Sequence, residues 1–438
     1  MTLSSGSHPA ADYSLGRSLR LTTFQIGSAM GEILTASVWN RVMITDLGML
    51  ATPVGLLLAL QYFLIPISLW AGHRSDTIPL WGRRRTSYIW LGRGLMLLTF
   101  PLLGLSVREF ESGQNTLGWM LATAAFILFG VGKLMSGSVY LALVRESAPP
   151  AKQGLAISLT ETVLIVLFPI AAIGFGRWME VYDRATFWQM IVGTVLAGAF
   201  FWWFAIARVE MQATPLPSRV APPGVSETLR RIWQDRRTRQ FFLFLAVATF
   251  AAWMQDNILE PFGGDVFGLP AGRTTRFTGY WGGATVLVLV ICFIVWRRRP
   301  PEQQRGVTGV GLFTMALGML LLAVAGWTHQ VHLISLCLLV YGSGFGLYTF
   351  GGLSLMAVMS PDRDSGAYLG LWTIAILLFK GAGTFFGGAI RDILYPLSPA
   401  LAYGIVFVVA ALGLLIAVNL LRGIDILAFA RESKRGQA

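Results

Sequence analysis

Long apolar runs alternate with short polar stretches along almost the whole chain. The hydrocarbon core of a bilayer is about 30 Å thick, and a helix of about 20 apolar residues crosses it. Twelve runs of this kind are predicted spans: 22–45, 50–71, 87–107, 118–142, 154–176, 186–207, 241–262, 278–296, 306–326, 331–355, 366–390 and 399–421. The pattern predicts an all-α integral membrane protein with twelve transmembrane helices in two six-helix halves.

The polar stretches divide the chain into five predicted parts. They are a cytoplasmic N-terminal tail (1–21), a six-helix bundle (22–207), a cytoplasmic linker (208–240), a second six-helix bundle (241–421) and a cytoplasmic C-terminal tail (422–438). Within the linker, Pro215, Pro217, Pro222 and Pro223 predict an extended first part. Ser226 is a suitable N-cap, so the second part is either a short interfacial helix through Arg237 or a solvated basic linker.

The loop 72–90 sets the expected orientation. It places Arg74, Arg83, Arg84 and Arg85 between two apolar runs, and such basic clusters stay in the cytoplasm. With the N-terminus inside, the tails and the even-numbered loops hold most of the 34 Lys and Arg residues. Both termini are therefore expected to be cytoplasmic.

Composition narrows the class of protein further. The chain is 55% hydrophobic and only 13% charged, which excludes an ordinary soluble domain. Its net charge of +12 comes from loops beside apolar runs, so membrane lipids are the expected partners and nucleic acid is not. Cys292 and Cys337 lie in apolar runs, and the sequence has no metal-ligand cluster, nucleophile–base set or phosphate-binding loop. An enzyme is not expected.

The loop 72–90 also resembles the loop between helices two and three of the major facilitator superfamily. The resemblance rests on Gly72, Asp76, Gly82 and Arg83–Arg85, although the spacer after Asp76 is longer than usual. It implies a cytoplasmic gate-like loop in which Asp76 accepts from backbone amides at a neighbouring helix end. The alternative is a plain basic loop.

A weak internal repeat fits the same fold. Leu141, Leu143, Pro149 and Gly154 recur at the same spacings as Leu353, Leu355, Pro361 and Gly366. Parallel repeats of six helices are typical of major facilitator transporters.

Ionisable groups inside spans are costly and need a partner or a wet cavity. The candidates are Glu32, Lys133, Glu161, Asp256 and Lys380, with Glu260 nearer the outer surface. They form either a proton- or substrate-linked cavity or structural ion pairs, such as Lys133 with Glu32 or Glu161. Arg93 lies near enough to the cytoplasmic end of its span to snorkel.

The seventh span ends in the most distinctive stretch of the chain, residues 255–267. Pro261 and the pair Gly263–Gly264 are expected to break the helix near the membrane face. The polar residues Gln255, Asp256, Asn257 and Glu260 should face the interior or an outward-facing cavity. Spans ten and eleven are rich in glycine, including Gly342, Gly383 and Gly387, which predicts close helix packing or else a flat groove.

Three stretches resemble the PucC/LhaA family, a branch of the major facilitator superfamily in phototrophic bacteria. They are QDxxLEPxGGxVF at 255–267, NRVMI at 40–44 and RRTxYIW at 84–90. The resemblance implies a factor of the bacterial inner (photosynthetic) membrane that assists assembly of light-harvesting antenna complexes, the core antenna being favoured over the peripheral one. The implied cargo is bacteriochlorophyll, and the implied partners are antenna polypeptides and bacteriochlorophyll-synthesis enzymes.

Pigment ligands are not obvious in the sequence. His8, His73, His329 and His332 all lie outside the middle of the spans. Magnesium also accepts oxygen ligands, so side-chain or backbone oxygens would suffice for weak, exchangeable binding.

Two other functions remain open. One is a proton-coupled small-molecule transporter that uses Glu32, Asp256 or Lys380. The other is a structural partner that shapes the antenna without carrying pigment.

Overall fold

The computed structural model describes residues 15–149, 152–210, 230, 232–296, 300–361 and 365–435. His8, the four linker prolines and Ser226 lie outside this part of the chain.

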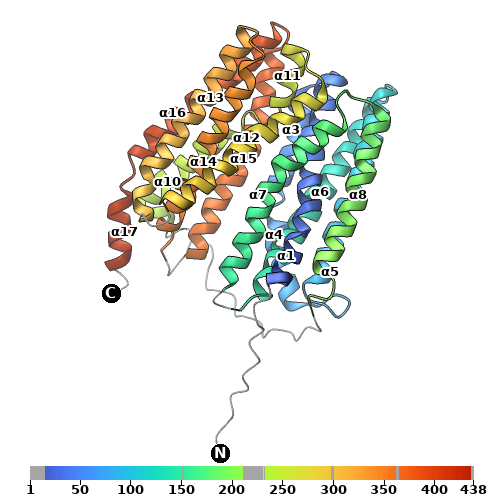
Figure 1. Cartoon of the computed structure of the whole chain (residues 1–438). Coiled ribbons are helices and arrows are strands. Elements are labelled where there is room, and N and C mark those ends of the chain that lie inside the picture. The colour runs from blue at the N-terminus through green and yellow to red at the C-terminus, as the bar shows by residue number, and fades with distance from the viewer. Residues whose placement is uncertain are drawn as a thin grey trace, which may run out of the picture. The chain divides into compact units, whose positions relative to one another are not determined.

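The described chain is almost entirely helical (Figure 1). Its first elements are α1 (Leu15–Thr22), α2 (Phe24–Ile33), η1 (Leu34–Trp39), η2 (Val42–Asp46), α3 (Ala51–Phe63), α4 (Pro66–Thr77), α5 (Thr86–Glu111), α6 (Asn115–Glu146), α7 (Gln153–Trp178) and α8 (Arg184–Ile206). The later elements are α10 (Arg236–Trp253), α11 (Leu259–Phe267), α12 (Ala271–Trp296), η4 (Pro301–Gln304), α13 (Arg305–Trp327), α14 (Leu333–Val358), α15 (Ser365–Leu394), α16 (Pro399–Arg422) and α17 (Ile426–Arg435).

Ten helical segments among the described residues are long and apolar enough to cross a membrane. They correspond to ten of the expected spans, and α3 and α4 together make one of them. The remaining expected spans, 22–45 and 241–262, are divided into shorter pieces. Residues 34–39 and 42–46 are π-helical, and residues 254–258 separate α10 from α11. The protein is an all-α, multi-pass membrane protein, and twelve spans stays a prediction.

The helix break expected at Pro261 is found at another position. The helix ends earlier, at Trp253, and Pro261 is the third residue of α11. Proline is tolerated in a first helical turn because the backbone amides there have no intrahelical partner. Gly263 and Gly264 also lie within α11, and Gly268 (φ +64°) ends it in the left-handed conformation that glycine adopts without strain.

By their contacts the residues fall into two units. Unit 1 comprises Met1–Leu34, Leu64–Phe168 and Trp188–Arg219, and unit 2 comprises Thr35–Phe63, Pro169–Phe187 and Val220–Ala438. The sequence-based division into two six-helix halves stays a prediction.

In unit 1, α5 and α6 pack with their backbones almost touching. A Cβ added to Gly92 would meet the carbonyl oxygen of Gly132 at 2.6 Å, and one added to Gly132 would overlap that of Gly92. Small residues allow this close approach between transmembrane helices.

Unit 2 uses glycine in the same way. Gly342 of α14 packs on the Trp281 carbonyl of α12, Gly383 of α15 packs on the Phe250 carbonyl of α10, and Gly387 packs on the Met254 carbonyl just beyond α10. The close packing expected of spans ten and eleven is confirmed at these positions.

Candidate functional site

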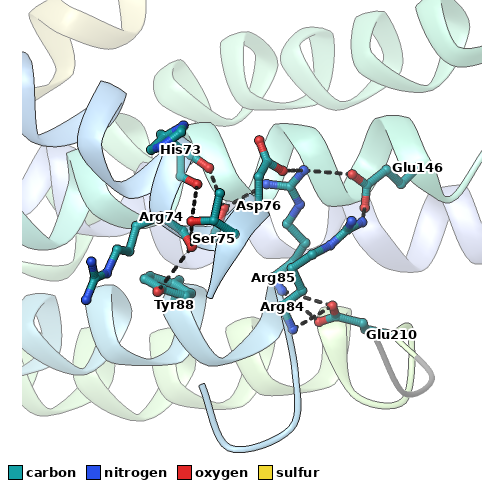
Figure 2. Close-up of polar contacts among 11 residues, drawn as sticks. His73, Arg74, Ser75, Asp76, Arg84, Arg85, Tyr88, Glu146 and Glu210 are labelled. Atoms are coloured by element: carbon teal, nitrogen blue, oxygen red, sulfur yellow. Dashed lines mark hydrogen bonds and ion pairs between the residues drawn. The ribbon is translucent and has the colours of Figure 1, made fainter. Parts of the chain in front are cut away.

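The loop between α4 and α5 forms a cluster of charged side chains within unit 1. We call it the loop cluster, and it comprises Asp76, Arg84, Arg85, Glu146 and Glu210 (Figure 2).

Glu210, just beyond the end of α8, accepts hydrogen bonds from the backbone at the start of α5. Its carboxylate oxygens lie 2.9 Å from the Arg84 amide nitrogen, 2.9 and 3.0 Å from that of Arg85, and 2.8 Å from that of Thr86. These amides have no intrahelical partner, and the helix dipole favours an anion there. Partial burial raises the pKa of Glu210, but the amide hydrogen bonds outweigh it and the pKa is lowered.

Arg85 is the buried centre of the loop cluster. Its guanidinium forms ion pairs with Asp76 and with Glu146 (2.7 Å), and it donates to the Ser75 hydroxyl at 2.7 Å. Arg84 binds the second oxygen of Glu146 at 2.9 Å. Arg85 is only 5% exposed, so its charge depends on these partners rather than on water.

Asp76 was expected to accept backbone amides at a helix end. In the structure that role belongs to Glu210, and Asp76 pairs with Arg85 instead. Trp81 (φ +49°) and Gly82 (φ +71°) are both left-handed in the tight turn before α5, and Leu80 and Arg83 pair across that turn. The Arg83 guanidinium lies over the Trp90 ring, 5.3 Å from its centre. Gly72 lies in α4, and a gate-like action of the loop stays a prediction.

The charged residues inside the spans of unit 1 are brought together only in part. Glu32 and Lys133 form an ion pair, one of the two pairings expected for Lys133. Glu161 is half-buried, and no cation of the described residues lies within ion-pair distance of it. Arg93 does not snorkel. It is 6% exposed, and its guanidinium lies between the Phe24 and Trp202 rings, 4.4 and 4.7 Å from their centres.

The polar stretch 255–260 lies inside unit 2, as expected. Gln255, Asn257 and Glu260 are at most 2% exposed. The Asn40 amide nitrogen donates to the Asn257 carbonyl at 3.0 Å, and the Asn257 amide nitrogen donates to the Ala51 carbonyl at 3.1 Å. The first bond satisfies a backbone carbonyl within the interruption between α10 and α11, and the second ties the interruption to the start of α3.

Glu260 heads a short chain of hydroxyl groups. It accepts from Thr278 at 2.6 Å, and the Thr278 hydroxyl lies 3.3 Å from that of Ser37. A buried carboxyl group is thereby held by two further segments of unit 2.

In unit 2, Lys380 lies beside aromatic side chains, and Asp256 lies near the same turn of α15. The Lys380 ammonium group is 3.4 Å from the centre of the Trp253 ring and 5.3 Å from that of Tyr62. Asp256 accepts from the Thr384 hydroxyl, one helical turn beyond Lys380, at 3.2 Å.

Trp253 also belongs to an aromatic cluster, which we define as Trp253, Trp281 and Phe345. The ring centres of Trp281 and Phe345 lie 5.5 Å apart, and both rings contact Trp253 edge-on. All three side chains are only half-buried. They offer accessible aromatic surface next to a cation, which the residue count alone did not predict.

Unit 2 also contains a buried charge network that the sequence pattern did not predict. Arg391 forms ion pairs with Asp265 (2.6 Å) and Asp392 (2.8 Å), and all three side chains are less than 10% exposed. Tyr403 donates to the Asp265 carboxylate at 2.5 Å. We call these four residues the Arg391 network.

Asp392 links this network to the start of α3. Its carboxylate accepts from the Ala51 amide at 3.0 Å and from the Thr52 amide at 2.6 Å. The sequence contains one signal for this network: Arg391 and Asp392, two adjacent opposite charges, stand at the end of an apolar run.

Among the described residues, no three His, Cys, Asp or Glu side chains are grouped so as to hold a metal ion. His73 lies in α4, and His329 and His332 lie between α13 and α14.

The long apolar helices define the class: the protein is a multi-pass α-helical membrane protein. Its fold is the major facilitator fold expected from the sequence, which the solved transporters described below share. The chain belongs to the PUCC protein family, whose family model matches residues 38–428.

Two curated relatives illustrate the match. The chain is 29% identical over 397 residues to Protein PucC of Rhodovulum sulfidophilum, covering 87% of this chain and 86% of that protein. It is 28% identical over 417 residues to the bacteriochlorophyll synthase 44.5 kDa chain of Rhodobacter capsulatus, covering 92% and 94%.

Solved transporter structures share the fold. A POT family transporter in complex with a thioalcohol-conjugated peptide has a TM-score of 0.71 at 12% identity, covering 94% of this chain and 96% of its own. The nucleoside transporter NupG has a TM-score of 0.69 at 12% identity, covering 94% and 99%. At such low identity the likeness concerns the fold alone.

Proposed function

We propose that the chain assists assembly of bacterial light-harvesting antenna complexes, the core antenna being favoured over the peripheral one. The observation that carries the proposal is the PUCC family match over residues 38–428, joined to the three motifs that resemble the PucC/LhaA family. The proposed role is to bind bacteriochlorophyll and pass it to antenna polypeptides. Catalysis is not part of the proposal.

The aromatic cluster is the proposed pigment contact. Trp253, Trp281 and Phe345 present half-buried rings that suit the flat face of a macrocycle. Lys380 lies over the Trp253 ring, and Asp256 accepts from Thr384 one helical turn further along α15; both would interact with polar substituents of the pigment. Gln255, Asn257 and Glu260 are buried beneath, so their proposed part is to hold the interrupted helix in place.

The proposed function also implies partners and a location in the cell. Membrane lipids, antenna polypeptides and bacteriochlorophyll-synthesis enzymes are the proposed partners. The proposed location is the bacterial photosynthetic inner membrane with both termini in the cytoplasm, which follows from the basic loops.

Gentle purification of the tagged protein from photosynthetically grown cells tests the proposal. The absorption spectrum reports bound bacteriochlorophyll, and mass spectrometry identifies co-purifying proteins. Pigment together with antenna subunits is the expected result. Antenna subunits without pigment would reduce the role to a structural one, and normal antenna levels in a deletion strain would overturn the assembly role itself.

A proton-coupled small-molecule transporter is the second candidate. The transporter-like fold and the Glu32–Lys133 pair inside unit 1 favour it. Flux into proteoliposomes that depends on a proton gradient and is lost in Asp256→Asn would support this function. Equal flux with and without the gradient would rule out proton-coupled transport.

A further inference from the structure

A groove lies on the surface of unit 2 where α13 begins and α16 ends. It has a volume of about 410 Å³ and is lined by Arg305, Gly306, Gly309, Val310, Phe313, Val418, Leu421 and Arg422. The groove is therefore apolar along most of its length and carries two arginines at one end.

Glycine leaves the floor of this groove open. A Cβ added to Gly306 or to Gly309 would meet no heavy atom within 4 Å. Val310 and Phe313, the next groove residues along α13, are 57% and 59% exposed. Both α13 and α16 are spanning helices, so these side chains face the hydrocarbon of the bilayer rather than water.

The polar end of the groove is positively charged. The Arg305 guanidinium donates to the carbonyl oxygen of Arg422, which ties the start of α13 to the end of α16. A guanidinium has five N–H donors, so others remain for a ligand. No carboxylate among the side chains that the structure describes lies within ion-pair distance of either arginine.

A second groove on α16 provides a contrast. It has a volume of about 370 Å³ and is lined by Gln240, Ile416, Asn419, Leu420 and Gly423. It has polar groups but no charged side chain, so nothing in it selects an anion.

We propose that the groove between α13 and α16 binds an anionic phospholipid. The phosphate lies against Arg305 and Arg422, and an acyl chain lies over Gly306 and Gly309 beside Phe313. Free inorganic phosphate would leave the apolar part of the groove unfilled, and a zwitterionic lipid would bring a second positive charge to the arginines. The inference rests on membrane insertion and not on the proposed role in antenna assembly.

Native mass spectrometry of the delipidated, full-length protein tests the proposal. Phosphatidylglycerol is expected to bind at one preferred site and phosphatidylcholine more weakly. The double variant Arg305→Gln/Arg422→Gln should weaken phosphatidylglycerol binding by about 25-fold, since each basic residue near a membrane surface contributes about 5-fold. Gly309→Leu should also prevent binding, because its side chain would occupy the open floor.

Matched variants separate this site from general effects of charge and volume. Arg145→Gln removes an exposed arginine from the last turn of α6, and Gly283→Leu adds a side chain to α12 where a Cβ also meets open space. Both are expected to bind phosphatidylglycerol like the wild type. Melting temperatures of the delipidated proteins check that every variant is folded.

Three results would overturn the proposal. They are equal affinity for the two lipids, equal loss of binding in the control variants, and displacement of the bound lipid by millimolar inorganic phosphate. Retention of a bacteriochlorophyll in this groove in place of a lipid would also contradict it.

Discussion

The Glu210 carboxylate accepts a hydrogen bond of 2.8 Å from the Thr86 amide, although 124 residues separate the two in the chain. Two further amides, those of Arg84 and Arg85, bind the same carboxylate. An acidic side chain from beyond the end of α8 thus binds the backbone of a loop whose arginine side chains pair with Asp76 and Glu146.

Glu210→Ala should destabilise the loop cluster. Removing a side chain that caps a helix costs about 0.5–2 kcal/mol, and here three amides lose their acceptor. A lower melting temperature in detergent, together with faster proteolysis between α4 and α5, is expected. Glu109→Ala, at the far end of α5, is the control because its side chain makes no hydrogen bond within the described chain.

The contribution of Glu210 should depend on pH in a defined direction. Hydrogen bonds from the amides lower its pKa, despite the opposing effect of burial. Its stabilisation is therefore complete above the unfolded-state pKa of about 4.3 and is lost as the pH falls through the lower folded-state value. The difference in melting temperature between wild type and Glu210→Gln should stay constant from pH 8 to 5 and shrink below about pH 4. A difference that changed between pH 6 and 8 would contradict this assignment.

Arg85→Lys should be far more damaging than Arg74→Lys. Arg85 holds Asp76, Glu146 and Ser75 at once, and a lysine cannot reproduce this forked geometry. Hydrogen bonds to charged groups contribute about 1.5–3 kcal/mol each, so a loss of that order is expected. Arg74 is exposed, and its variant should melt like the wild type. Equal melting temperatures for the two variants would show that Arg85 is dispensable.

Asp392→Ala should destabilise unit 2 more than Asp425→Ala does. Both aspartates accept from the first amides of a helix, α3 and α17 respectively. The Asp392 side chain, however, is only 9% exposed and also neutralises Arg391. Breaking a buried pair by removing one partner costs about 3–5 kcal/mol, against about 1 kcal/mol for an exposed cap. Chemical unfolding followed by tryptophan fluorescence measures the difference.

Trp281→Leu should reduce co-purified bacteriochlorophyll if the aromatic cluster is its contact surface. Contacts between aromatic rings contribute about 0.5–1.5 kcal/mol, which corresponds to a loss of about 2–10-fold in pigment per protein. Trp203→Leu removes an exposed tryptophan of α8 and is expected to retain the pigment.

The sequence predicts the fold well because each long apolar run can be satisfied only as a helix. It misplaces the break near Pro261 because residues 254–258 contain neither proline nor glycine. That break is stabilised by Asn40, more than two hundred residues away, which donates to the Asn257 carbonyl. A local pattern carries no information about such a bond.

The charged sites were likewise predicted only where a local pattern marks them. Lys133 was identified from its position inside a span, and one of its two candidate partners, Glu32, pairs with it. Glu210 and the Arg391 network were missed because their side chains lie at the ends of spans, where charges are common. Their importance comes from partners brought close only by folding, such as Asp265, which lies 126 residues before Arg391.

This separation has a consequence for the order in which the protein is made. Asp265 leaves the ribosome well before Arg391, and at about 5–20 residues per second the delay is about 6–25 s. The delay is longer still for the Ala51 amide, because its acceptor Asp392 is synthesised 341 residues later. Until α15 has been synthesised, the start of α3 and the end of α11 lack these partners. The nascent chain therefore reaches its final arrangement only when nearly all of its spans are in the membrane.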